Sequence, residues 1–149
     1  MTTVREMTAA DLPEVFAVRV STLENTITMR ELEEDYGLTP VTLAKALQHS
    51  AKGWVCEIEG RITGFAMGDR DSGEMTVLAV VPGFEKRGIG KQLLERVQNW
   101  LFDAGHTELW LVTTPDPTFR AYGFYQAQGW VATGELVDGE DERFLLRQV

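Results

Sequence analysis

Residues 78–94 read LAVVPGFEKRGIGKQLL, an apolar run followed by a glycine-containing loop and then by an amphipathic stretch. This pattern predicts a buried strand, a loop that ends at Arg87–Gly90, and a helix. Bare backbone N–H groups at a helix N-terminus attract anions, and the helix dipole strengthens the attraction. The stretch therefore predicts a phosphate site made by backbone amides rather than by a cluster of charged side chains.

Two familiar nucleotide-binding loops do not fit this stretch. The mononucleotide P-loop, Gly-x4-Gly-Lys-Ser/Thr, would need a glycine at Glu85 and a hydroxyl residue at Gln92. The dinucleotide motif Gly-x-Gly-x-x-Gly fails at Leu93, which stands in the third glycine position. Since no strand-loop-helix unit opens the chain either, we exclude both classes of nucleotide-binding domain.

Length and composition indicate one globular domain, residues 1–149, long enough to bury roughly two-thirds of its unfolded surface. The chain is 44% hydrophobic and 25% charged, and its net charge is −9. A nucleic-acid-binding protein would present a basic face, so we expect no nucleic-acid partner. The acidic balance is compatible with a cationic acceptor such as an amine, although an acidic surface commonly serves solubility alone.

Cysteine and histidine usage bears on redox chemistry and metals. The single cysteine, Cys56, excludes an internal disulfide, and its alternation with Trp54 and Ile58 indicates a packing residue. Two histidines and one cysteine give no metal-ligand spacing, so we expect no metal. The first residues lack an apolar signal-peptide core, and no segment approaches membrane-span length. We therefore expect a cytoplasmic protein without a membrane partner.

Hydrophobic periodicity divides the chain into strands and helices in the order β-α-α-β-β-β-α-β-α-β-β, an α+β arrangement. A helix is predicted from Asp11, with Phe16, Val20 and Leu23 on one face, and the polar segment Ser21–Tyr36 follows it. Further helices are predicted from Thr39-Pro40 and over Gly90–Ala104 and Thr118–Gln128. The predicted strands are Val4–Met7, Trp54–Glu59, Ile62–Met67, Glu74–Val81, Glu108–Thr113, Val131–Leu136 and Arg143–Arg147.

Two motifs resemble those of the GNAT family, the GCN5-related N-acetyltransferases. Val80-Val81-Pro82 and Gly88-Ile89-Gly90 match the strand end and the loop of its motif A, with Glu85 where the family usually has Gln or Arg. Arg120–Trp130 resembles motif B, an aromatic helix that ends in Gly-aromatic. The predicted order of elements also matches the family over nearly the whole chain. The resemblance implies a central, mostly antiparallel twisted sheet flanked by helices.

The resemblance implies that acetyl-CoA is the co-substrate and that a primary amine of a small molecule or peptide attacks it directly. Gly88 and Gly90, with the amides of Arg87, Ile89 and Lys91, would hold the pyrophosphate. The cations Lys86, Arg87 and Lys91 would offset Glu85. Ala79, Val80 and Val81 would pair with the pantetheine arm, and the Val80 N–H would polarise the thioester carbonyl. Arg120, in the second motif, is assigned to the cofactor-binding residues.

The catalytic residues that the resemblance implies are Tyr125 and Glu74. Tyr125 matches the tyrosine that protonates the departing thiolate, since a phenol with a pKa of ~10 can donate at neutral pH. Glu74 matches the glutamate base of the histone acetyltransferase branch, with Asp69 and Glu57 as weaker candidates. A chain of water molecules is an alternative base. His49 and His106 stand at predicted helix ends, where solvated caps are common.

The acceptor is expected in the segment Asn25–Leu38, facing Thr113–Tyr122. Glu31, Glu33, Glu34 and Asp35 could draw a cationic amine there, although such a charge run is typical of a solvated helix face. The competing interpretation is a GNAT-like module that senses acyl-CoA without turnover. Dimers are common in the family, which leaves a homodimer as an alternative to a monomer.

Overall fold

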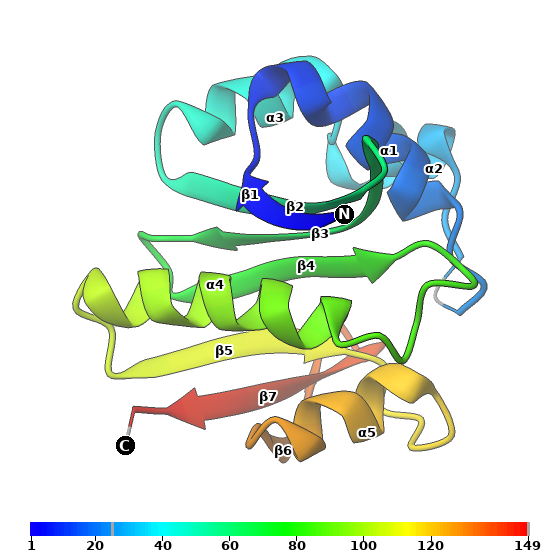
Figure 1. The fold of residues 1–149 in the computed structure, drawn as a ribbon. Helices are drawn as coiled ribbons and strands as arrows, with labels where there is room; N and C mark the ends of the chain where they lie inside the picture. Colours follow the sequence, from blue (N-terminus) through cyan, green and yellow to red (C-terminus); the bar gives the residue numbers. More distant parts are fainter. Residues whose placement is uncertain (25, 149) are drawn as a thin grey trace.

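The computed structural model describes residues 1–24 and 26–148 and contains one seven-stranded sheet (Figure 1). The strand order across the sheet is β1-β2-β3-β4-β5-β7-β6. The strands are β1 (Thr2–Glu6), β2 (Ala51–Ile58), β3 (Arg61–Asp69), β4 (Glu74–Val80), β5 (Glu108–Thr113), β6 (Val131–Val137) and β7 (Asp141–Arg147). Each predicted strand is present, with ends that differ by a few residues at most.

The sheet is antiparallel except between its central strands, β4 and β5. In the described part of the chain, these two parallel strands share a single register pair, Glu74 with Trp110. Beyond that pair the strands diverge toward their C-terminal ends, which leaves one edge of β4 without a partner strand. The expectation of a mostly antiparallel sheet is confirmed, and the gap between β4 and β5 is the feature that positions the candidate site.

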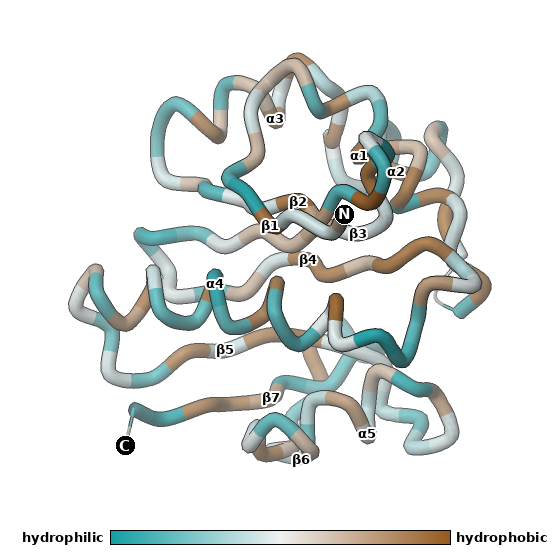
Figure 2. The backbone as a smooth tube through the Cα atoms, viewed as in Figure 1, coloured by the Kyte–Doolittle hydropathy of each residue, from teal (hydrophilic) through white to brown (hydrophobic). Residues whose placement is uncertain are grey.

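Helices cover both faces of the sheet. They are α1 (Leu12–Val20), α2 (Met29–Tyr36), α3 (Pro40–Leu47), α4 (Ile89–Asp103) and α5 (Arg120–Ala127), with a short 3-10 turn, η1 (Ala9–Asp11), before α1. Buried side chains of α4 and α5 share one hydrophobic cluster with β5 and β7, whereas those of α1 form a second cluster on the other face. Figure 2 shows the central strands in brown and the segment just before α4 in teal, so the predicted phosphate loop is hydrophilic.

The region between β1 and β2 differs from the prediction, because the described residues form three helices there instead of two. Helix α1 ends at Val20, and Leu23, predicted on its apolar face, is 73% exposed beyond its end. A new helix begins at Thr28, whose hydroxyl accepts the Glu31 N–H while the Glu31 carboxylate accepts the Thr28 N–H. This reciprocal cap fixes the start of α2 inside the segment predicted only as polar.

Helix α4 packs closely on β3 because β3 carries two glycines on the facing side. A Cβ at Gly64 would lie 3.2 Å from Leu93, and one at Gly68 would lie 2.8 Å from Val97. Both neighbours belong to the buried face of α4. The glycines thus set the height of α4 above the sheet and, with it, the position of the first turn of the helix.

Within the described residues, no helix is both long and apolar enough to cross a membrane. Those residues also contain no group of three or more His, Cys, Asp or Glu side chains that could hold a metal ion.

Candidate active site

The loop between β4 and α4 turns sharply, and the N–H groups at the start of α4 are left without side-chain caps. Gly83, Lys86 and Gly88 have φ angles of 95°, 63° and 78°, in the left-handed region that favours glycine. Gly88 is the N-cap residue of α4, and no side chain caps this helix in the described structure. The first N–H groups of a helix have no acceptor within the helix. The N-terminus of α4 is therefore suited to an anion, as the sequence predicts.

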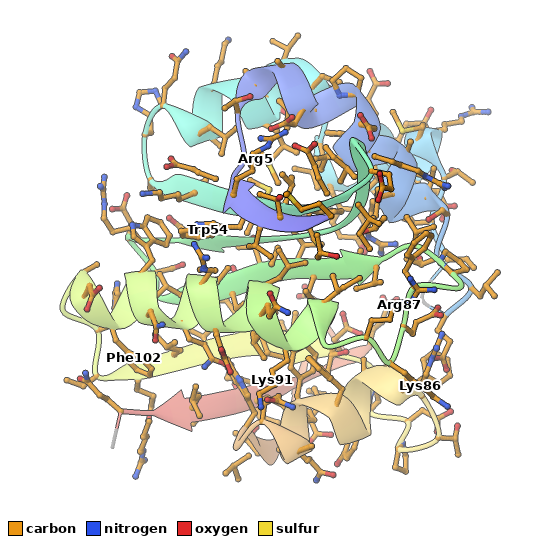
Figure 3. The ribbon with its side chains drawn as sticks, in the orientation of Figure 1. Arg5, Trp54, Lys86, Arg87, Lys91 and Phe102 are labelled. Atoms are coloured by element: carbon orange, nitrogen blue, oxygen red, sulfur yellow. The ribbon has the colours of Figure 1, made fainter. Side chains whose placement is uncertain are left out.

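Three cations surround this helix start, and all three are exposed. Lys86 and Arg87 lie in the loop and Lys91 lies on the first turn of α4 (Figure 3). The Arg87 guanidinium stacks 4.9 Å from the centre of the Phe84 ring. An anion at the amides would meet positive charge in a region that remains open to solvent.

The charge of Glu85 is offset by Arg120 rather than by the neighbouring cations. Its carboxylate accepts the Gly83 N–H at 2.8 Å and pairs with the Arg120 guanidinium at 3.3 Å. The hydrogen bond from Gly83 is the main reason why the pKa of Glu85 is lowered, and Arg120 adds to it. Arg120 also contacts the carboxylate of Glu24. The proposed cofactor-binding arginine is thus held between two carboxylates at the start of α5.

The two sequence motifs meet at Gly90. A Cβ placed there would lie 3.5 Å from Phe124 of α5 and 4.0 Å from Val80 of β4. The first turn of α4 is thereby wedged between the end of β4 and the aromatic helix. Folding has brought motif A and motif B together at the gap between β4 and β5.

Tyr125 lies in the core beneath this junction and is only 6% exposed. Its ring makes edge-to-face contacts with Phe124, Trp130 and Phe144. Burial raises the pKa of the phenol, so the hydroxyl stays protonated at neutral pH. Among the described residues, no group hydrogen-bonds to this hydroxyl. A protonated phenol that has no hydrogen-bond partner is suited to donate its proton to a thiolate that comes within hydrogen-bond distance.

Glu74 stands at the point where β4 and β5 diverge. Burial raises the pKa of its carboxyl, and the nearby Asp69 raises it further, whereas Arg143 lowers it. Burial also favours the neutral form of Asp69, but hydrogen bonds that include those with Ser50 and Ser72 lower the pKa of Asp69 overall. The two neighbouring carboxyls therefore differ in proton affinity. Glu74, with the raised pKa, is suited to acid–base chemistry, whereas Asp69, with the lowered pKa, is suited to remain an anion.

The remaining candidate bases lie elsewhere. Glu57 is tied to Arg5 by an ion pair beside β1. His106 contacts the carbonyl oxygen of Arg70, and His49 is exposed just after α3. In the described structure none of these three contacts the loop before α4.

The acidic residues of α2 do not face the protein interior. Glu31, Glu33, Glu34 and Asp35 are exposed, and among the described residues of α2 only Leu32 is buried. Asn25, the first residue of the predicted acceptor segment, lies outside the described residues. Glu24 was not predicted, yet it reaches Arg120 and joins the α1–α2 connection to α5. No local pattern signals a contact between residues that are 96 positions apart.

Comparison with known proteins identifies the family to which this chain belongs. The model of the acetyltransferase (GNAT) family matches residues 15–130, so the chain belongs to that family. No curated protein sequence matches the chain.

Solved structures share the fold over almost the whole chain. A PaiA N-acetyltransferase from Thermoplasma acidophilum, in complex with coenzyme A, is 17% identical, with 99% of both chains covered and a TM-score of 0.83. Ard1 from Thermoplasma volcanium is 19% identical over 99% of this chain and 98% of that chain, with a TM-score of 0.76. The ribosomal-protein-S18-alanine N-acetyltransferase from Escherichia coli is 20% identical over 97% and 91%, with a TM-score of 0.71. At these identities the likeness shows the common fold.

Proposed function

We propose that this protein is an N-acetyltransferase that moves an acetyl group from acetyl-CoA to a primary amine of a small molecule or peptide. The observation that carries the proposal is the bare first turn of α4 beside the divergence of β4 and β5. The amides would hold the pyrophosphate, and the unpaired edge of β4 would receive the pantetheine arm. Lys86, Arg87, Lys91 and Arg120 would supply the surrounding positive charge.

The hydrogen bonds of β4 support a role for the Val80 amide. The Val81 N–H donates to the Thr63 carbonyl oxygen of the β3 side at 2.8 Å. Successive N–H groups of a strand point to opposite edges. The Val80 N–H is therefore directed toward the gap beside β5, where a thioester carbonyl could accept it. Ala79, Val80 and Val81 would line the pantetheine arm as an added strand.

In the proposed reaction the amine nitrogen attacks the thioester carbon, a C–N bond forms and the C–S bond breaks. Glu74 stands six residues before Val80 on β4, so it accepts the proton that the amine loses through a chain of water molecules. The Val80 N–H stabilises the negative charge that develops on the carbonyl oxygen. Tyr125 donates its hydroxyl proton to the departing thiolate. The products are an N-acetylated amine and free coenzyme A.

Calorimetric titration with acetyl-CoA and free CoA, with ATP and NAD as controls, tests the site. We expect saturable binding of the two CoA forms alone. Release of thiol on addition of amines then tests the reaction. Binding without thiol release from a broad panel of amines would indicate an acyl-CoA-binding module instead of an enzyme.

The substitution Gly90→Asp provides the matching loss of function. Its carboxylate would stand among the amides that hold the pyrophosphate, and we expect CoA binding to be lost. A negative charge in the first turn of a helix is favourable for the helix itself, so the fold should persist. Retained CoA affinity in a folded Gly90→Asp protein would contradict the assignment of this loop.

A further inference from the structure

Two arginine side chains from different elements lie over the same aromatic ring beside the loop that precedes α4. Arg61 is the first residue of β3, and Arg87 stands just before Gly88, the N-cap residue of α4 (Figure 3). Their Cζ atoms lie 5.7 Å and 4.9 Å from the centre of the Phe84 ring. The fold thus adds a cation from β3 to those that the loop itself carries.

A tight turn places the Phe84 ring between these two arginines. The Phe84 N–H donates to the Val81 carbonyl oxygen at 3.1 Å, and the residues between them are Pro82 and Gly83, the latter with a φ of 95°. Proline followed by a residue with positive φ is typical of a type II turn. The half-buried ring packs against the hydrophobic cluster beneath α4. The ring is therefore a platform that the core holds in place.

Neither guanidinium on this platform is neutralised by the protein. Among the described residues, Arg61 and Arg87 are exposed and form no ion pair, whereas carboxylates pair with Arg5, Arg30, Arg120, Arg143 and Arg147. Glu14 lines the same shallow hollow as Arg61, but its carboxylate accepts the Ile62 N–H at 2.8 Å. Two like charges on one ring repel each other, and an anion bound by both would remove that repulsion.

The chemistry of a guanidinium over a ring favours phosphate as that anion. The ring face attracts the cation and leaves the N–H edge of the guanidinium open to a ligand. That edge is a planar fork of donors that matches phosphate oxygens in pairs. Because Arg87 adjoins Gly88, one of the two forks lies next to the amides that we propose bind the pyrophosphate.

Coenzyme A carries a second phosphate group close to its pyrophosphate. This is the monoester on the 3′-oxygen of the ribose, which is mostly dianionic at neutral pH. A single ribose ring joins it to the pyrophosphate, so the two groups lie within the length of one arginine side chain. Arg120, the other arginine beside the loop, is already held by Glu24 and Glu85.

We propose that Arg61 and Arg87, held over Phe84, bind the 3′-phosphate of CoA and make the protein select CoA over 3′-dephospho-CoA. The inference rests on the proposed function and adds to it the residues that recognise the nucleotide end of the co-substrate. Phe84 is a positioning residue, because it orients the two guanidiniums and does not itself contact the phosphate.

Calorimetric titration with CoA and with 3′-dephospho-CoA, at the same salt concentration, tests the selection. The two ligands differ only in the 3′-phosphate. We expect the Kd for 3′-dephospho-CoA to be at least about tenfold higher, because charge-assisted bonds from two guanidiniums are lost. Equal Kd values would overturn the inference and leave the proposed acetyl transfer intact.

Arg61→Gln tests the arginine that β3 contributes. We expect the Kd for CoA to rise about fivefold and the Kd for 3′-dephospho-CoA to stay nearly unchanged, because Arg61 would contact the 3′-phosphate alone. Arg96→Gln is the matched control, since Arg96 is exposed on α4 and its loss changes the net charge equally. Equal rises for both ligands in Arg61→Gln, or the same rise in Arg96→Gln, would overturn the assignment.

Phe84→Leu tests the platform. Leucine keeps an apolar contact with the core but offers no aromatic face to the guanidiniums. We expect the ratio of the two Kd values to fall about threefold or more, and Phe84→Tyr, which keeps the ring face, to retain the parental ratio. Urea unfolding verifies that both variants are folded. A parental ratio in folded Phe84→Leu would overturn the positioning role of the ring.

Because each readout is a binding constant, this inference and the proposed reaction can fail separately. Selection of CoA over 3′-dephospho-CoA without thiol release from any amine would support the phosphate site while the acetyl transfer fails. Thiol release that proceeds equally well from the acetyl thioesters of CoA and 3′-dephospho-CoA, with equal Kd values, would do the reverse. Absence of binding of either ligand would overturn both.

Discussion

At the scale of single residues, Tyr125 and Glu74 owe their chemistry to burial. Both side chains lose solvation, which disfavours their charged forms and raises the pKa of each. For the phenol this preserves a proton to donate, and for the carboxyl it increases the affinity for a proton. Each change of pKa suits the role that the family resemblance gives the residue.

Replacement of Tyr125 by Phe should lower turnover about a hundredfold and leave the Kd for CoA nearly unchanged. The hydroxyl is lost, whereas the ring contacts with Phe124, Trp130 and Phe144 are kept. The measurements are kcat by thiol release and Kd by calorimetry. Tyr122→Phe is the control, since Tyr122 lies on the same helix and also packs against Phe144. Equal turnover in the Tyr125→Phe variant and its parent would exclude Tyr125 as the acid.

The pH dependence of kcat/KM tests Glu74. A general base acts when deprotonated, so we expect activity to fall as the pH drops through the pKa of Glu74, which lies above the ordinary value of a glutamate. Glu74→Gln should lower the rate and remove this acidic limb, and Glu74→Asp should retain the limb at a reduced rate. Persistence of the limb in Glu74→Gln would assign the proton transfer to Asp69 or to a water chain.

At the scale of secondary-structure elements, the loop before α4 and the start of α5 are joined by an ion pair beside the proposed CoA site. The ion pair of Glu85 with Arg120 makes this link, and Glu24 extends it to the α1–α2 connection. A carboxylate so close to the amides that we propose bind phosphate would oppose an incoming pyrophosphate. Arg120 would gain a phosphate partner only by loosening its hold on Glu85.

Removing the charge of Glu85 should therefore strengthen CoA binding. Glu85→Gln retains an oxygen acceptor for the Gly83 N–H and releases Arg120 from one of its two carboxylate partners, and we expect the Kd for CoA to fall about tenfold at low salt. The gain should shrink as salt screens the interaction. Calorimetry at two salt concentrations measures it. Glu95→Gln, an exposed change on α4, controls for net charge, and an unaltered or weaker affinity in Glu85→Gln would contradict this account.

At the scale of the whole molecule, the distance between α4 and β3 links the packing of the core to the position of the proposed phosphate site. The interface is closed by Gly64 and Gly68, which leave no room for a side chain. Protein interiors are densely packed and transmit strain, so a lift of α4 would also displace its first turn. Stability and CoA affinity are thus expected to depend on the same contact.

Gly68→Ala should lower the free energy of unfolding by about 1–3 kcal/mol, because its Cβ would lie 2.8 Å from Val97 and 3.2 Å from the Glu74 carbonyl oxygen. Urea unfolding measures the loss. Gly123→Ala on α5 is the matched control, since nothing lies within 4 Å of its new Cβ, and it should be neutral or stabilising. Equal stability of the two variants would show that α4 is free to adjust.

The local patterns of the sequence predicted most of the fold. Alternating apolar residues located the strands, Gly88 located the start of α4, and the two motifs indicated the family that the comparison then confirmed. These features depend on residues near in sequence, where periodicity and backbone conformation act. Helix α2 was not predicted, because its start depends on a reciprocal cap at Thr28 and Glu31 rather than on an apolar stripe.

By itself, the sequence determined the family, most of the elements and the glycine at the start of α4, because each depends on short-range periodicity or on the conformational freedom of glycine. Only the tertiary structure decided that Arg120 is held by Glu24 and Glu85 and that Asp69 adjoins Glu74. These features join residues far apart in the chain through strand register and helix packing. Such contacts leave no periodic trace in the sequence, since many different pairs of residues could occupy the same neighbouring positions.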